Sequence, residues 1–175
     1  MKILNTYITL LILALVLNAC EPPRQVSPIP EISFKQFTLF DTIDILGNPT
    51  KGGLLEFAFI DGDGDLGLEQ PFPGQTDTTN VFFTLFRKVD GTFVEANEDD
   101  ILNPSDFRIP YIERTGQNKI IEGTVAITLF YLFYELGDTI MYDFNIEDRA
   151  GNLSNTATTC EIYFTLEGSC KPEGN

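Results

Sequence analysis

The sequence feature best suited to chemistry is a set of aspartates at alternate positions separated by glycines, Asp61-Gly62-Asp63-Gly64-Asp65. Glycine lets the backbone wrap tightly, so the three carboxylates can converge on one point. Calcium takes roughly six to eight oxygen ligands in irregular geometry, and it suits this segment better than magnesium or zinc. The alternative interpretation is that Asp-Gly pairs simply form a turn between strands.

The aspartate segment does not follow the EF-hand pattern. Leu66 stands where that loop requires glycine, and Phe72 replaces its closing glutamate. A calcium site built on Asp61, Asp63 and Asp65 therefore needs ligands from elsewhere in the chain. We expect one from Glu147 or Asp148, in a later turn that a sandwich topology would place at the same end of the molecule.

Composition argues against catalysis. The chain has no histidine, so a Ser-His-Asp or Cys-His arrangement and an HExxH zinc site are excluded. Paired carboxylates could hydrolyse glycosides, but a chain with 26 acidic residues always offers pairs, so this signal alone is uninformative. We interpret the chain as non-enzymatic.

An aromatic run from Phe130 to Tyr134 is the second candidate site. Exposed aromatic side chains, here Tyr131 and Tyr134, could stack on sugars or anchor a protein partner. The alternative is a strand end that is buried on both faces.

The first 20 residues differ from the rest of the chain. Lys2 precedes a short apolar run that ends in Leu17-Asn18-Ala19-Cys20. A positive start, an apolar stretch and small residues at the cut are typical of a secretory signal, and the run is too short to span a membrane. The last four residues resemble the lipobox of bacterial lipoproteins. The resemblance implies cleavage before Cys20 by signal peptidase II and attachment of diacylglycerol and a further acyl chain, such as palmitate, to Cys20.

The sequence divides into a signal peptide (1–19), a lipidated proline-rich tether (20–30), a domain (31–170) and a short tail (171–175). Extended, the tether could lift the domain roughly 30 Å from the membrane.

Removal of the signal takes away one base and no acid, which changes the net charge from −15 to −16. So acidic a chain repels nucleic acid and anionic lipid.

Two cysteines follow the lipidated one. In an oxidising envelope compartment, Cys160 and Cys170 are a candidate disulfide. The alternative is that Cys160 is a small core residue and Cys170 a free thiol.

From residue 31 onward the apolar residues recur with period two, which predicts strands. The alternation is clearest over 121–129, 140–147 and 160–166. Weaker strands are expected at 32–40, with a slip near Gln36, and at 54–60, 81–88, 92–95 and 107–112. Turn residues separate these segments, and none longer than ten residues has a helical period. The pattern predicts an all-β, antiparallel sandwich of about seven or eight strands.

The segment Asp148-Arg149-Ala150-Gly151-Asn152-Leu153-Ser154 resembles the turn that joins the last two strands of bacterial immunoglobulin-like domains. The resemblance implies an immunoglobulin-like sandwich and says nothing about activity.

The overall layout is similar to that of small envelope lipoproteins with one such domain. We expect a binding or adhesion module that is anchored through its lipid and stiffened at one end by calcium. The expected location is the outer membrane, and the sequence leaves open whether the domain faces the periplasm or the cell surface. A glycan or an envelope protein is the expected ligand. The alternative is an accessory subunit of an envelope complex.

Overall fold

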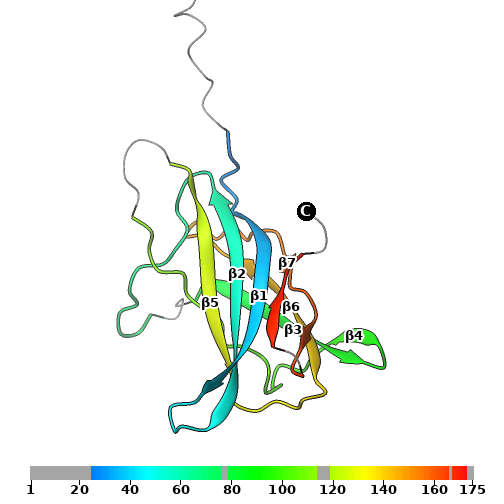
Figure 1. Cartoon of the computed structure of the whole chain (residues 1–175). Helices are drawn as coiled ribbons and strands as arrows, with labels where there is room; N and C mark the ends of the chain where they lie inside the picture. Colours follow the sequence, from blue (N-terminus) through cyan, green and yellow to red (C-terminus); the bar gives the residue numbers. More distant parts are fainter. Residues whose placement is uncertain (1–24, 76–78, 114–118, 166, 173–175) are drawn as a thin grey trace, which may run out of the picture.

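The computed structural model describes residues 25–75, 79–113, 119–165 and 167–172 (Figure 1). The signal peptide, Cys20 and the first part of the tether lie outside these residues. Within the described part of the chain, no helix is long and apolar enough to cross a membrane. The described residues form nine strands: β1 Glu31–Ile43, β2 Pro49–Asp61, β3 Val81–Val89, β4 Thr92–Glu95, β5 Ile121–Tyr131, β6 Thr139–Ile146, β7 Ala157–Thr158, β8 Ile162–Tyr163 and β9 Gly168–Cys170.

Two antiparallel sheets pack face to face, which confirms the predicted all-β sandwich. The first sheet has the order β5-β2-β1-β9. The second has the order β4-β3-β6-β7, with β8 also paired to β6. The slip expected near Gln36 is present as a register shift between Phe34 and Gln36 in the pairing of β1 with β2.

Alternate side chains of both sheets fill the core. On β6, every second residue from Ile140 to Ile146 is buried. Phe57 on β2 and Phe144 on β6 bring their ring centroids to 5.1 Å across the two layers. Tyr142 is fully buried, and its hydroxyl donates to the Leu102 carbonyl at 2.8 Å. That bond satisfies the only polar atom of the side chain and ties the segment after β4 to the core.

The predicted strand at 160–166 is wrong in its extent, because the chain breaks into short pieces there. The Tyr142 N–H donates to the Thr159 hydroxyl at 3.0 Å, where a regular ladder would use a backbone carbonyl. β7 therefore ends at Thr158, and β8 resumes the pairing with β6 at Ile162. The predicted strand at 107–112 is also wrong: it is reduced to isolated bridges at Phe107 and Pro110, and a proline has no N–H for a ladder.

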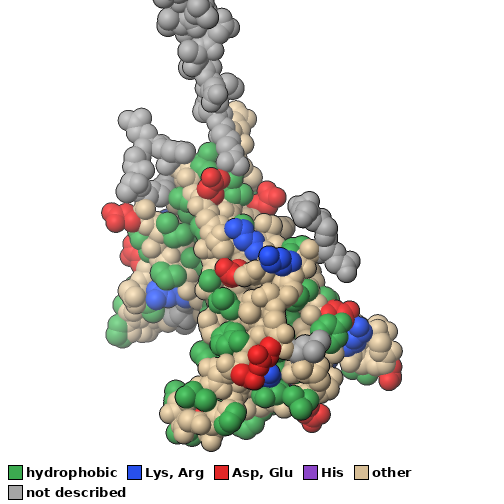
Figure 2. Space-filling view, in the orientation of Figure 1, with side chains coloured by type: hydrophobic (Ala, Val, Ile, Leu, Met, Phe, Trp, Pro, Cys, Tyr) green, Lys and Arg blue, Asp and Glu red, His purple; other side chains and the backbone are tan. Residues whose placement is uncertain are grey.

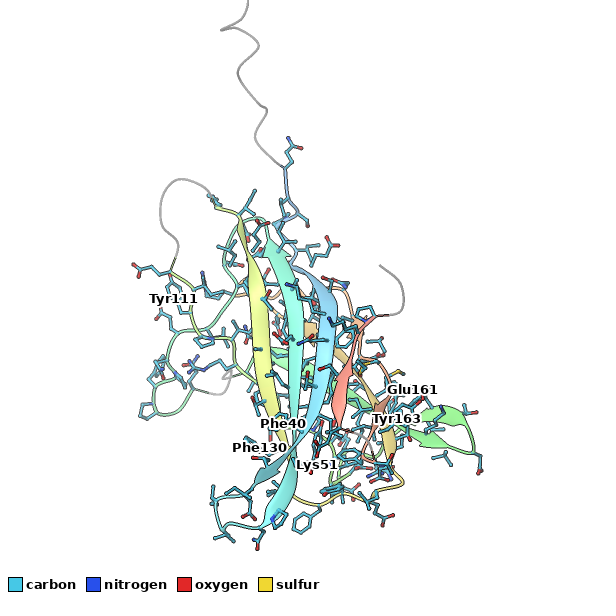
Figure 3. The ribbon with its side chains drawn as sticks, in the orientation of Figure 1. Phe40, Lys51, Tyr111, Phe130, Glu161 and Tyr163 are labelled. Atoms are coloured by element: carbon cyan, nitrogen blue, oxygen red, sulfur yellow. A yellow bond between two sulfur atoms is a disulfide. The ribbon has the colours of Figure 1, made fainter. Side chains whose placement is uncertain are left out.

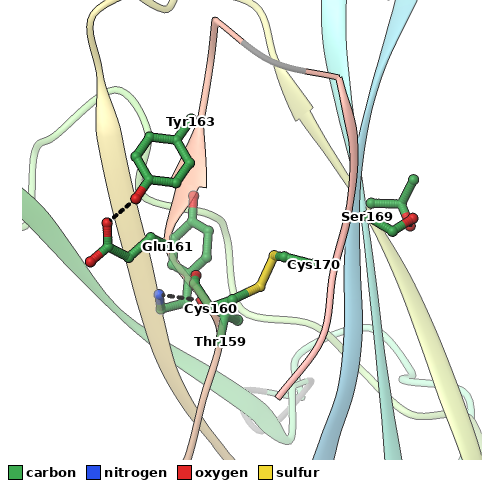
Figure 4. The surroundings of a disulfide bond; sticks show 8 residues. Thr159, Cys160, Glu161, Tyr163, Ser169 and Cys170 are labelled. Atoms are coloured by element: carbon green, nitrogen blue, oxygen red, sulfur yellow. Dashed lines mark hydrogen bonds between the residues drawn. A yellow bond between two sulfur atoms is a disulfide. The ribbon is translucent and has the colours of Figure 1, made fainter. Parts of the chain in front are cut away.

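A disulfide joins the two sheets near the C-terminus. Cys160 follows β7 and Cys170 ends β9, and their Cα atoms are 6.2 Å apart (Figure 4). Because β9 pairs with β1, the bridge fastens the edge of the first sheet to the segment that leaves β7.

The core is packed tightly around Gly53 on β2. A methyl group there would lie 2.4 Å from the ring of Phe37, which is buried and has no room to withdraw. We expect Gly53→Ala to lower the free energy of unfolding by about 1–3 kcal/mol, measured by urea denaturation.

Gly137→Ala is the matched control, since nothing lies within 4 Å of its added methyl group. It should change the stability by less than about 0.5 kcal/mol. Equal effects of the two substitutions would contradict the tight packing.

Candidate functional site

The three aspartates of the glycine-rich segment converge where β2 ends. Asp61 is the last residue of β2, and Asp63 and Asp65 lie in the loop that follows. One carboxylate oxygen from each lies within 4.8 Å of the others. The alternate spacing noted in the sequence thus produces a cluster rather than a row of diverging side chains.

The glycines make this loop possible. Gly64 and Gly67 have φ of 68° and 92°, a region that strains other residues. Gly67 has a second constraint, because an added Cβ would lie 2.4 Å from the Pro110 carbonyl oxygen. At Gly62 an added Cβ would lie 2.3 Å from the Ser27 carbonyl oxygen, so the end of the tether packs directly on the loop.

Asp61 is the most enclosed member of the cluster, with 0% of its surface exposed. Its Oδ2 accepts the backbone N–H groups of Asp65 and Leu66 at 2.9 and 3.0 Å. Its Oδ1 is shielded from solvent and has no hydrogen-bond donor among the described residues, and the same holds for Oδ1 of Asp65. Carboxylate oxygens buried in this way are costly unless a cation, a proton or a water molecule satisfies them.

The electrostatics of the loop oppose three negative charges. Burial raises the pKa of Asp61, as do the nearby charges of Asp63 and Asp65, against the lowering effect of the Leu66 N–H. Burial, followed by the charges of Asp148 and Asp63, raises the pKa of Asp65. The site therefore holds excess negative charge that a divalent cation would neutralise.

The turn that begins at Asp148 packs against this loop, as the sandwich topology implied. The backbone N–H of Arg149 donates to the Asp65 carbonyl at 3.3 Å, and Nη1 donates to the Gly67 carbonyl at 2.7 Å. The Asp148 carboxylate, however, accepts both the backbone and the side-chain N–H groups of Asn152, each at 2.8 Å. Asp148 thus acts on Asp65 through its charge, and its oxygens hold the turn.

The prediction of a binding surface at Tyr131 is wrong. Only 3% of Tyr131 is exposed, and its ring packs edge-on against Phe164 at 4.9 Å. Tyr134 is half-buried and stacks on the same Phe164 ring, with the ring centroids 5.3 Å apart. The inward alternation of Ile127 and Leu129 on β5 continues to Tyr131, and this signal places its ring in the core.

A group of exposed apolar side chains lies at the end of the sandwich away from the aspartate loop, and it includes part of the aromatic run from Phe130 to Tyr134 that the sequence marked as a candidate partner surface. It comes from the β1–β2 hairpin, the end of β5 and the loop after it (Figures 2 and 3). We call it the apolar end. Its exposed side chains are Ile43, Ile45, Leu46, Phe130, Leu132, Phe133 and Leu136. Contiguous exposed apolar side chains are typical of a surface that contacts another molecule.

Comparison with protein-family models, with curated proteins and with solved structures finds no match. The aspartate loop and the exposed surfaces are therefore the features of the molecule that bear on its function.

The raised pKa of Asp61 predicts the effect of neutralising it. An acid whose pKa is higher in the folded than in the unfolded state weakens folding as the pH rises through that interval. In excess chelator at pH 7, Asp61→Asn should therefore be at least as stable as the unmutated protein, because its side-chain oxygen can still accept the two backbone N–H groups. Thermal unfolding measures this.

Asp143→Asn is the control, since the Asp143 carboxylate bonds Thr158 in an exposed position on β6. A marked loss of stability in Asp61→Asn under chelator would contradict the electrostatic account.

Proposed function

We propose that the chain is a lipid-anchored, non-catalytic binding module of a bacterial cell envelope, with calcium stabilising one end of an immunoglobulin-like sandwich. One observation carries the calcium assignment. Asp61 is completely buried with an unsatisfied Oδ1, and two further carboxylates converge on it.

The spacing of the oxygens is compatible with calcium. Oxygens bound to one calcium at roughly 2.3–2.6 Å can be at most about 5.2 Å apart, whereas those bound to one magnesium at about 2.1 Å are limited to about 4.2 Å. The cluster, whose oxygens all lie within 4.8 Å of one another, is within the range that one calcium ion can bridge. The absence of sulfur and imidazole from the cluster argues against softer metals.

The position of the loop suggests what the ion would do. The Gly62 N–H donates to the Ser27 carbonyl at 2.9 Å, so the end of the tether is attached to the aspartate loop. A bound ion would stiffen the junction between a membrane-anchored tether and the sandwich. It would thereby fix how the domain is held above the bilayer.

The apolar end supports a binding role. It lies away from the tether, and on a domain anchored through Cys20 it would face outward (Figure 1). A glycan or an envelope protein is the proposed ligand class. The high negative charge disfavours nucleic acid. An accessory subunit of an envelope complex would use the same surface for a constant protein partner.

Calcium should raise the unfolding temperature of the unmutated protein and leave that of Asp61→Asn unchanged. An ion at about 100 times its dissociation constant stabilises the folded state by about 2.7 kcal/mol. Calorimetric unfolding in calcium and in excess chelator measures this, with Asp143→Asn as a control that should respond like the unmutated protein. Equal midpoints with and without calcium would refute the site.

Lipid attachment is tested separately. Cells that express the chain and are fed labelled palmitate should incorporate the label into the unmutated protein and not into Cys20→Ser. Cys170→Ser is the control and should remain labelled. Absence of label from the unmutated protein would contradict the anchor while leaving the calcium site untouched.

A further inference from the structure

β5 is an unprotected edge strand. It pairs with β2 along all eleven of its residues without a register shift, and no other strand lies on its outer side in the described sheet. Natural edge strands are usually short or carry lysine, proline or a bulge that prevents further pairing. β5 contains none of these, and its one charged residue, Glu122, lies near its beginning.

A groove of about 660 Å³ runs along this edge. All six residues 123–128 line it, which means that it follows the edge of β5 and not one face, where only alternate residues would contribute. Among the described residues, no backbone hydrogen bond outside the sheet involves residues 123–128. Alternate N–H and C=O groups of an edge strand point outward, so the groove offers main-chain donors and acceptors.

Residues 107–112 form the opposite wall of the groove. Hydrogen bonds hold this wall in place: the Ile109 N–H donates to the Asn80 side chain at 2.7 Å, and its carbonyl accepts the Leu68 N–H at 2.9 Å. Tyr111 lies on this wall (Figure 3), and the Arg149 guanidinium lies 4.9 Å from the centroid of its ring. Because β5 and residues 107–112 wall the groove on both sides, it accommodates one extended chain more readily than the edge of a second folded sheet.

The residues that line the groove indicate which side chains a bound peptide segment would carry. Phe59, Phe107 and Ile127 supply an apolar floor, so inward-pointing residues of a bound strand should be apolar. The Arg108 guanidinium is already bonded to the carbonyls of Leu68 and Glu69. The chain as a whole carries a net charge of −15, which attracts basic residues on the outward face of the bound strand.

We propose that the groove between β5 and residues 107–112 binds an extended polypeptide segment with alternating apolar and basic residues, which adds a strand to the edge of the first sheet. This mode of recognition takes its affinity from main-chain hydrogen bonds and its specificity from alternate side chains. A matching segment of six residues would span about 20 Å. The proposal goes beyond the calcium-stabilised binding module, and it does not depend on the ion.

The test uses the purified full chain and an end-blocked peptide of four Val-Lys repeats, with binding followed by fluorescence anisotropy of a labelled peptide. The same peptide with N-methyl groups on its two central valines retains its charge but loses two donors. A peptide of four Val-Glu repeats reverses the charge. We expect binding of the first peptide and at least tenfold weaker binding of the other two.

Two variants locate the site. Thr128→Lys changes an exposed groove residue, and Val125→Lys changes a half-buried one whose folding is checked by thermal unfolding. Val94→Lys is the matched control, because it adds the same charge to an exposed valine on β4, an edge strand of the other sheet. The two groove variants should weaken binding at least tenfold, and the control should leave it within twofold.

Several results would overturn the proposal. They are absence of binding to the unmutated protein, equal binding of the N-methylated peptide, and equal loss in Val94→Lys and Thr128→Lys. Sedimentation of the unmutated protein could give one further contradicting result. A dimer that Thr128→Lys converts to a monomer would assign the edge to a second copy of this chain.

Discussion

The concentration of negative charge at the end of β2 is the constraint around which this end of the sandwich is organised. Two charged carboxylates whose oxygens lie within 4.8 Å of each other repel by at least about 0.9 kcal/mol in water and about 3.5 kcal/mol at an effective dielectric constant of about 20. Part of this repulsion is offset by the N–H groups of Asp65 and Leu66, which both donate to Asp61. Oδ1 of Asp61 and Oδ1 of Asp65 have no hydrogen-bond donor among the described residues, and a bound cation would satisfy them.

Several otherwise separate segments meet on this loop. Ser27 at the end of the tether, Arg149 in the turn after β6 and Pro110 in the groove wall all contact it through backbone atoms or long side chains. The loop therefore lies against both the tether junction and one wall of the β5 groove. The apolar end lies away from these contacts, so an ion at the loop would affect it least.

Much of the fold was readable from the sequence because half-buried strands impose a period of two. The alternation identified β1 to β6, and it placed the bulge near Gln36. It overestimated the strand at 160–166, because the Thr159 side chain replaces a backbone acceptor, which no apolar pattern records. The aspartate cluster was predictable because glycine spacing and carboxylates are local features.

The surfaces were less predictable. Exposure of Ile45, Leu46 and Phe133 depends on loops whose apolar residues do not alternate, so the sequence alone could equally place them in the core. The β5 groove depends on which strand ends the sheet and on where residues 107–112 run, and both are properties of the tertiary arrangement. Asp148 was correctly expected near the aspartates, but its engagement by Asn152 depends on the detailed shape of the turn.

The most direct test of the central claim is the stoichiometry of calcium binding, measured by calorimetric titration of the chelator-treated protein at pH 7. We expect one ion per chain at the aspartate loop, with the binding heat abolished in Asp61→Asn and retained in Asp143→Asn. Absence of binding heat in the unmutated protein at several temperatures, together with no calcium retained in equilibrium dialysis, would contradict it. The loop would then be a turn whose buried charges have no counterion.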